Sequence, residues 1–319
     1  MAKVVLEFEK PIVELEFKLE ELKNLSDSNN MDVKEEISVF TKKLEETKKR
    51  VYSGLTSWQK VQLARHPNRP YMLDYVQRIF TDFMPICGDR RYAEDAAIIC
   101  GFAKIDGQAL MLIGTQKGRD IKENVLRNFG CPHPEGYRKA LRAMELGEKA
   151  RVPIVSLIDT PGAFPGIASE ERHIGEAIAV NLREMFKFTV PVITAVLGEG
   201  GSGGALGIGV GNKILILENA YYSVITPEGC AAILWKDRAF SAKAADSLRL
   251  TSAELKEFGI IDEIVQEPIG GAHNNHDEAA EYLKKSLLKN IKTLMKLSGE
   301  ELRNQRYKKF RQIGRFIEE

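Results

Sequence analysis

The sequence predicts an α/β protein preceded by a helical segment. From about Cys87 onward, short runs rich in Val, Ile, Leu and Ala read as buried strands, and stretches with helical spacing alternate with them. Alternation of this kind indicates βαβ crossovers within a sheet. Before Cys87 the apolar residues recur only at helical spacing, and this difference marks the helical segment.

The first 85 residues are predicted to form a helical hairpin followed by a third helix. One apolar stripe begins after Pro11, a residue suited to a first helical turn, and a second follows the polar break NLSDSNNMD. A third helical pattern, TSWQKVQLARHPNRPYMLDYVQRIF, is interrupted at Pro67 and Pro70, where the chain must turn. The two stripes comprise Ile12, Leu15, Leu19 and Leu22, then Val33, Ile37, Phe40, Leu44 and Val51.

Residues 86–296 carry the α/β pattern, and residues 297–319 return to a helix. The predicted strands are AAIICGFA, QALMLIG, VPIVSLID, VPVITAVL and KILILE, with helices over 136–150 and 170–188. The last helix has a possible capping box at Ser298 and Glu301 and packs through Phe310, Ile313 and Ile317.

Composition limits the possible partners and the compartment. The 319 residues carry a formal net charge of only +1, so no global field would recruit nucleic acid or an anionic membrane. Apolar runs are strand-sized, which predicts no membrane insertion. The start of the chain turns acidic within a few residues and has no signal-peptide core, which predicts a cytoplasmic protein. The four scattered cysteines and five histidines show no metal-ligand spacing, so we expect no metal site in this chain.

The most informative segment is GEGGSGG, residues 198–204, directly after the apolar run VPVITAVL. Consecutive glycines allow backbone amides to approach a ligand closely. If Gly203 and Gly204 open a helix, their N–H groups can converge on a developing oxyanion without any side-chain base.

Two other motifs match the same residues. GEGGSG fits the dinucleotide fingerprint GxGxxG, with Glu218 downstream, but earlier strands precede it and another strand follows within ten residues. GGSGG fits the nucleophile elbow GxSxG, with Ser202 as nucleophile and Asp262 and His273 as partners. Both alternatives are weaker than the backbone-amide interpretation.

A second tight turn, DTPGAFPG (residues 159–166), follows the preceding strand VPIVSLID. If the two strands are neighbours in a parallel sheet, both glycine segments line its carboxyl edge, where α/β sheets bind ligands. We expect them to form two walls of one binding site.

The chain resembles the carboxyltransferase alpha subunits of bacterial acetyl-CoA carboxylase. The resemblance rests on motifs found in order across most of the chain, together with the PIVELE helix and the LARHPNRPYMLDY turn. These motifs are GDRRYAEDAAI, GTQKGRD with NFG, PEGYRKALR, IDTPGAFPG, EERHIGEAIA, GEGGSGGAL, YSVITPEGCAAILW and EPIGGAH.

The resemblance implies a crotonase-like fold, a spiral of ββα units, behind the helical N-terminal segment. It also implies a partner beta subunit that carries zinc, an α2β2 assembly, and cooperation with biotin carboxylase, the ATP-using component. The implied reaction moves a carboxyl group from carboxybiotin on biotin carboxyl carrier protein to acetyl-CoA, giving malonyl-CoA, the first committed step of fatty acid biosynthesis. No tightly bound cofactor is expected in this chain.

By the same resemblance, Gly203 and Gly204 form the oxyanion hole on the biotin side. Substrate-binding residues are expected in three places: Gly201 before the helix, Gly162, Ala163 and Phe164 in the DTPGAFPG turn, and Lys117 and Arg119 in a basic segment facing coenzyme A phosphates or the partner.

Overall fold

An eight-stranded sheet forms the centre of the protein in the computed structural model, which describes residues 4–29 and 34–314. The order is β1-β2-β3-β4-β5-β6-β8, and the short β7 pairs with the end of β5. The strands are β1 (Thr81–Pro85), β2 (Ile98–Ile105), β3 (Gln108–Thr115), β4 (Ile154–Thr160), β5 (Val192–Gly201), β6 (Lys213–Leu217), β7 (Tyr221–Ser223) and β8 (Glu263–Val265).

The sheet is mixed, with antiparallel pairing at one edge and parallel pairing over the rest. β1, β2 and β3 form an antiparallel meander, whereas β3 to β6 and β8 are parallel. Every residue of β4 and β5 is buried, as expected for central parallel strands covered on both faces. The five strands predicted from apolar runs are confirmed as β2 to β6.

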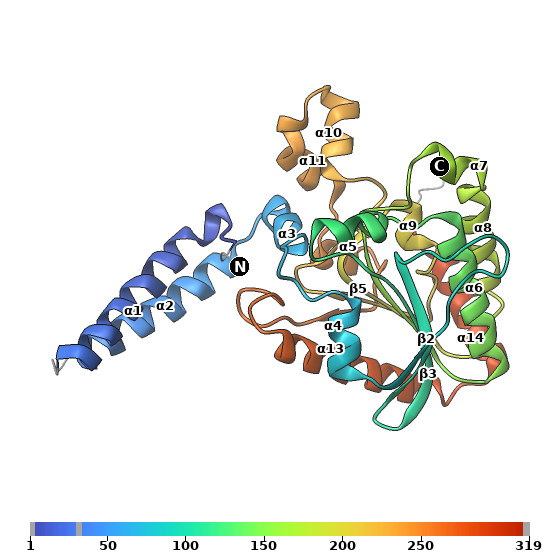
Figure 1. Cartoon of the computed structure of the whole chain (residues 1–319), viewed down its shortest axis with the longest axis horizontal. Coiled ribbons are helices and arrows are strands. Elements are labelled where there is room, and N and C mark those ends of the chain that lie inside the picture. Colours follow the sequence, from blue (N-terminus) through green and yellow to red (C-terminus); the bar gives the residue numbers. More distant parts are fainter. Residues whose placement is uncertain (1–3, 30–33, 315–319) are drawn as a thin grey trace, which may run out of the picture.

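Helices cover both faces of the sheet. In Figure 1, α6 and α8 lie to the right of the strands, and α4 and α13 lie to their left. The α-helices are α1 (Lys10–Asn29), α2 (Lys34–Ser53), α3 (Ser57–Ala64), α4 (Met72–Ile79), α5 (Ile121–Leu126), α6 (Pro134–Lys149), α7 (Ile167–Glu171), α8 (Ile174–Met185), α9 (Ser202–Leu206), α10 (Pro227–Trp235), α11 (Ser241–Leu248), α12 (Ser252–Glu257), α13 (His276–Leu294) and α14 (Gly299–Arg311). Short 3-10 turns occur at η1 (Glu7–Glu9), η2 (Asn128–Gly130) and η3 (Arg238–Phe240).

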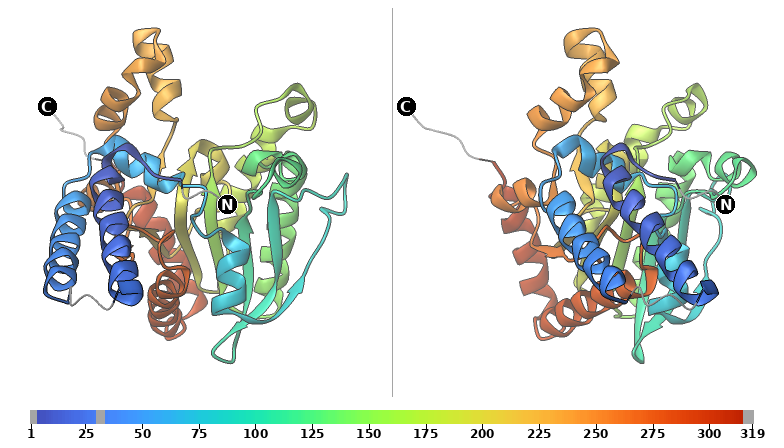
Figure 2. Two further views of the ribbon diagram at one scale, coloured as in Figure 1. Left: turned by 60° about the vertical axis from the view of Figure 1, so that its left-hand side comes forward. Right: turned by 90° about the vertical axis from the view of Figure 1, so that its left-hand side faces the viewer.

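Two pairs of helices stand away from the sheet. α1 and α2 form the predicted hairpin at one side of the molecule, and α10 and α11 project beyond the carboxyl ends of the strands (Figures 1 and 2). No described helix combines the length and the apolar character needed to cross a membrane.

A buried ion pair fastens the connection between α3 and α4 to the body. Arg69 and Glu267 are fully enclosed and bonded at 2.5 and 2.9 Å, and Arg69 also donates to the Leu197 carbonyl. The second Glu267 oxygen accepts from the amide of Ala272 at 2.7 Å. Burial alone would raise the pKa of Glu267, but the charge and hydrogen bonds of Arg69 lower it.

The C-terminal helix α14 is anchored by a buried arginine that has uncharged partners. Its buried Arg306 donates to the carbonyls of Met185, Phe188 and Val190 and to Oδ1 of Asn212. The predicted capping box is confirmed, since Ser298 Oγ accepts from the Glu301 amide and Glu301 accepts from the Ser298 amide. Phe310 packs edge-on against Phe186, whereas the predicted contact at Ile317 lies outside the described residues.

The structure differs from the sequence-based prediction in three places. The helix expected over 170–188 is broken, because His173 adopts a left-handed conformation (φ 63°) between α7 and α8. The GEGG residues, expected as a turn, continue β5 up to Gly201. Strand β1 lies inside the N-terminal segment expected to be helical and pairs with β2. The division at residues 85 and 297 otherwise stays a prediction.

Candidate functional site at the carboxyl edge of the sheet

The two glycine segments meet at one edge of the sheet. β4 and β5 are parallel neighbours, with Thr160 opposite Gly200, so the DTPGAFPG turn and helix α9 leave the sheet side by side. A Cβ on Gly204 would overlap the backbone of Gly162 and Ala163, and a Cβ on Gly201 would overlap that of Pro161. The close approach therefore requires glycine at both positions.

Helix α9 starts directly where β5 ends. Ser202 makes this change of direction in the left-handed region (φ 52°), a conformation that costs a non-glycine residue some strain. The first N–H groups of any helix have no partner within it, so those of Gly203 and Gly204 are available to a ligand. Tyr137 fixes the far side of α9 by donating to the Gly204 carbonyl at 3.1 Å, and Asn181 donates to the Gly207 carbonyl at 3.0 Å.

An apolar cavity of about 470 Å³ opens beside this helix start. Ser202 and Gly203 are among its lining residues. Its wall is largely hydrophobic and includes Leu206, Tyr222, Val224, Leu248, Phe258 and Phe310. An apolar cavity with a few polar groups at one end is typical of small-molecule sites.

The DTPGAFPG turn is held by the strand that precedes it. Thr160 Oγ1 contacts the carbonyls of Gly130 and Gly162 at 2.7 and 2.9 Å. Phe164 donates its backbone N–H to the Pro132 carbonyl, and its ring lies 4.4 Å from that of His133. The predicted binding residues Ala163 and Phe164 are half-buried, and the Ala163 amide lies beside Gly204 of α9.

A buried ionic network lies beneath the two glycine segments. Lys117 Nζ lies 2.6 Å from Asp159 Oδ1 and 2.8 Å from Glu199 Oε1, and Arg65 Nε lies 2.7 Å from Glu199 Oε2. Tyr221 also donates to Glu199 at 2.6 Å, and the Glu199 amide donates to Asp159. The network joins the ends of β3, β4, β5 and β7 to α3.

Charge determines the protonation of this network. Burial alone would raise the pKa of Glu199, but the charges of Lys117 and Arg65 outweigh it and lower the pKa to about 2. Burial alone would lower the pKa of Lys117, and the charges of Asp159 and Glu199 raise it instead. Lys117 and Glu199 are therefore both ionised at neutral pH.

The expected phosphate contact of Lys117 and Arg119 stays a prediction, and both cations already have carboxylate partners within the chain. Lys117 is occupied by two carboxylates, and Arg119 pairs with Asp74 at 2.5 Å while its guanidinium stacks on Tyr71 at 3.9 Å. A phosphate at either position would have to displace a carboxylate.

The two alternative interpretations of the GEGGSGG segment are wrong. Asp262 accepts from the Ile214 amide and pairs with Lys309, while His273 lies next to Glu9, so neither residue is a partner of Ser202. The dinucleotide fingerprint requires a long helix after the glycines, whereas α9 has five residues.

Exposed apolar side chains occur on several segments on the side of the molecule where the strands end, and α5, α7, α9 and α10 all lie on that side (Figure 1). We call them the apolar rim. Scattered exposed apolar residues are ordinary, but a group of them around a concave site indicates a surface that a partner covers. The rim comprises Ile121, Val125, Leu126, Phe129, Ile167, Val224, Ile233 and Leu234, each more than half exposed.

Comparison with known proteins decides the family. The family model described as acetyl co-enzyme A carboxylase carboxyltransferase-like matches residues 5–314. The chain belongs to this family. The family expected from the sequence is therefore confirmed.

Relatives in the family match over nearly their full length. Acetyl-coenzyme A carboxylase carboxyl transferase subunit alpha of Geobacter metallireducens is 53% identical over 98% of this chain and 98% of its own length. The protein of the same name from Syntrophotalea carbinolica is 55% identical over 96% of both chains. That from Haemophilus influenzae is 54% identical over 97% of this chain and 98% of its own.

Solved structures of more distant proteins share the fold. A transcarboxylase 12S structure aligns with a TM-score of 0.57 at 18% identity, covering 70% of this chain and 41% of the other. The beta subunit of P. aeruginosa geranyl-CoA carboxylase aligns with a TM-score of 0.56 at 18% identity, over 76% and 46%. The predicted crotonase-like α/β fold of this acetyl-CoA carboxylase carboxyltransferase family member is confirmed.

Sequence reasoning missed the ionic network. Its members come from five separate segments, and no local spacing links them. Glu199 lies inside the GEGGSGG motif, and Asp159 lies inside DTPGAFPG. A charged residue within a motif of small residues was therefore the only sequence signal for the network.

Proposed function

We propose that this chain is the alpha subunit of the carboxyltransferase of acetyl-CoA carboxylase, and that it moves the carboxyl group of carboxybiotin to acetyl-CoA, giving malonyl-CoA. The observation that carries the proposal is the start of α9 packed against the DTPGAFPG turn beside an apolar cavity. Family membership supplies the reaction, and the geometry supports the part that this chain plays in it.

Negative charge develops twice in the reaction. When the N–carboxyl bond of carboxybiotin breaks, electrons pass to the ureido oxygen of biotin. When the methyl group of acetyl-CoA loses its proton, electrons pass to the thioester oxygen, and the resulting carbanion forms the new carbon–carbon bond to the carboxyl group. The freed ureido nitrogen takes the methyl proton, so charge and atoms balance without a side-chain base.

The amides of Gly203 and Gly204 are proposed as the hydrogen-bond donors to the ureido oxyanion. Backbone donors fixed in this way stabilise the transition state without moving during the reaction, and one such donor contributes ~3 kcal/mol. The partner subunit supplies the second oxyanion hole, for the thioester.

The biotin group is proposed to lie against the two glycine segments, at the edge where they meet. Gly162, Ala163 and Phe164 form one wall, and Gly201 with the start of α9 forms the other. For Lys117 and Arg119, whose charges already have carboxylate partners, we propose an indirect contribution. They hold the strand ends and the 67–74 connection in place around the site.

The site requires further proteins. We propose a beta subunit, which carries zinc, as the partner that covers the apolar rim in an α2β2 assembly. Biotin carboxyl carrier protein delivers carboxybiotin, and biotin carboxylase reloads it. We expect no tightly bound cofactor in the reaction site of this chain. The cytoplasm is the proposed location, and four unpaired cysteines agree with it.

An assay of the reverse reaction tests the proposal. The purified chain, alone and mixed with its cognate beta subunit, is given malonyl-CoA and free biotin, and decarboxylation is followed. We expect activity only in the mixture, and its loss in Gly204→Val. Activity of the chain alone would instead indicate a self-sufficient crotonase-type enzyme, and full activity of the Gly204→Val mixture would refute the role of the helix start.

A further inference from the structure

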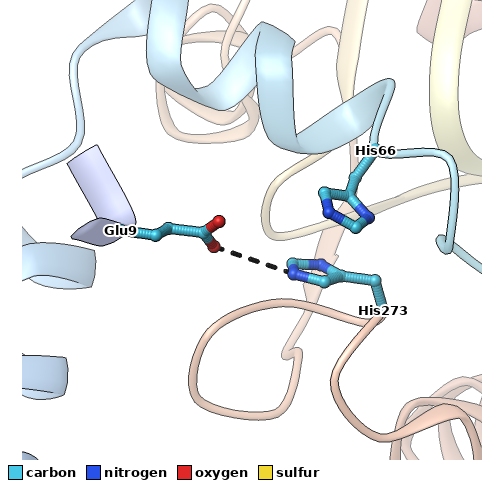
Figure 3. Close-up of side chains that lie close together, drawn as sticks. All are labelled: Glu9, His66 and His273. Atoms are coloured by element: carbon cyan, nitrogen blue, oxygen red, sulfur yellow. Dashed lines mark ion pairs between the residues drawn. The ribbon is translucent and has the colours of Figure 1, made fainter. Parts of the chain in front are cut away.

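Three side chains with metal-binding atoms meet far from the glycine segments. Glu9 comes from η1, His66 from the connection after α3, and His273 from the loop before α13 (Figure 3). One donor atom from each lies within 4.8 Å of the other two. His66 is 2% exposed, and the side chains of Glu9 and His273 are 8% and 7% exposed.

The two histidine rings stack on each other beside the carboxylate. Nε2 of His273 lies 3.7 Å from Oε1 of Glu9, and the two rings overlap at 3.9 Å with their planes 24° apart (Figure 3). Nδ1 of His273 is buried without a hydrogen-bond partner, and a Cβ on Gly271 would lie 3.0 Å from it. The Nδ1 edge is therefore packed against the chain, and Nε2 is the edge that can bind.

The hydrogen bonds of His66 are long. Its Nδ1 accepts from the Asn68 amide at 3.2 Å, and its Nε2 lies 3.3 Å from the Val4 carbonyl. Both values are near the upper limit for a nitrogen–oxygen or nitrogen–nitrogen hydrogen bond, so the ring can give up one of these contacts to an ion at small cost.

The Glu9 carboxylate is buried, and its hydrogen-bond donors are a hydroxyl and a backbone amide. Oε1 of Glu9 accepts from the Tyr52 hydroxyl at 2.8 Å, and Oε2 accepts from the Leu6 amide at 2.9 Å. Among the described residues, the only ion pair found for Glu9 is the one with His273, which is charged only when protonated.

The carboxylate and the two imidazoles beside it form a donor set of two nitrogens and one oxygen. We propose that Glu9, His66 and His273 bind one divalent transition-metal ion of the Zn²⁺ type. This is the donor set of many zinc sites, in which metal–ligand distances are about 2.0–2.2 Å. Binding would draw the three donors closer together by rotation of the rings, and the neighbouring cavity of about 400 Å³ has room for a water molecule as fourth ligand.

The ion would join three separate parts of the chain. η1 leads into the α1–α2 hairpin, whereas His66 and His273 belong to loops that the Arg69–Glu267 pair holds against the body. The site therefore fastens the N-terminal segment to the sheet domain, and it is independent of the carboxyl-transfer site.

Direct metal binding tests this proposal. The full chain is freed of metal with a chelator and titrated with Zn²⁺ in a calorimeter, and with Co²⁺ while its visible spectrum is recorded. We expect one ion per chain, a raised unfolding temperature, and a tetrahedral Co²⁺ spectrum without the strong thiolate bands that cysteine ligands give.

Matched variants locate the ion. Glu9→Gln and His273→Gln remove one donor each with little change in shape, and we expect at least tenfold weaker binding in both. His276→Gln is the control, because the His276 ring bonds to the Asn68 carbonyl outside the cluster. The metal affinity of this variant should equal that of the unmodified chain. Circular dichroism and unfolding in chelator show whether each variant folds. No binding by the folded chain, or equal binding by all variants, would overturn the proposal.

Discussion

Replacement of Gly204 by alanine changes one methyl group at the point where the two glycine segments touch. The new Cβ would lie 2.8 Å from the Gly162 Cα and closer still to the adjoining backbone, whereas ordinary contacts begin at 3.4 Å. Backbone cannot rotate away as a flexible side chain can, so α9 or the DTPGAFPG turn must move by at least roughly half an ångström.

We expect this movement to affect catalysis more than stability. An oxyanion-hole donor contributes ~3 kcal/mol to the transition state, so a misdirected amide should lower kcat about a hundredfold. Overpacking a site of this kind costs about 1–3 kcal/mol of unfolding free energy, which the protein should tolerate. The assay is biotin-dependent decarboxylation of malonyl-CoA by the complex with the beta subunit.

Gly203→Ala is the matched control. At this neighbouring position the nearest atom to an added Cβ is Ile178 Cδ1 at 3.6 Å, an ordinary contact on the side of α8. We expect the Gly203→Ala complex to retain activity close to that of the unmodified protein. Equal activity of the two variants, at either a high or a low level, would refute the argument that contact between the two segments sets the geometry of the donors.

Three further predictions concern other parts of the structure. Glu267→Gln leaves the Arg69 guanidinium buried without its ion pair. Denaturant titration should therefore show a loss of about 3–5 kcal/mol in unfolding free energy. An unchanged denaturant midpoint would contradict this. The pKa of Glu199 is lowered from 4.5 to about 2. The ionised Glu199 side chain should therefore stabilise the fold fully above about pH 4.5, and this stabilisation should disappear as the pH falls toward 2. Acid unfolding followed by fluorescence should lose this pH dependence in Glu199→Gln. Phe164→Ala should raise KM for biotin but leave KM for malonyl-CoA unchanged, and unaltered biotin kinetics would exclude a binding role for this ring.

Much of the fold could be predicted because it depends on local pattern. The runs VPIVSLID and VPVITAVL became β4 and β5, since a wholly buried parallel strand needs an uninterrupted apolar sequence. The end of β5 was harder to predict, because glycines favour turns by their intrinsic preference. Here Glu199, which is bonded to Lys117 and Arg65, and the pairing of Gly200 with Thr160 keep these residues extended.

The candidate site was predictable only where it consists of backbone. Gly203 and Gly204 are neighbours in sequence, and their meeting with the DTPGAFPG turn follows from the order of two adjacent strands. The ionic network and the Glu9, His66 and His273 cluster depend on side chains from distant segments, and only the folded chain shows that they meet. The break at His173 likewise depends on a left-handed residue that no helical pattern signals.

The apolar rim has a consequence for how the cell must supply this protein. A chain that displays Ile121, Leu126, Phe129 and Val224 around an open site tends to associate with other copies or to attract chaperones and proteases while it waits for its partner. Surplus synthesis of one subunit would then be wasted as aggregate or degraded. Balanced production of the two subunits is therefore a requirement imposed by the surface of the protein, in addition to any requirement of metabolic flux.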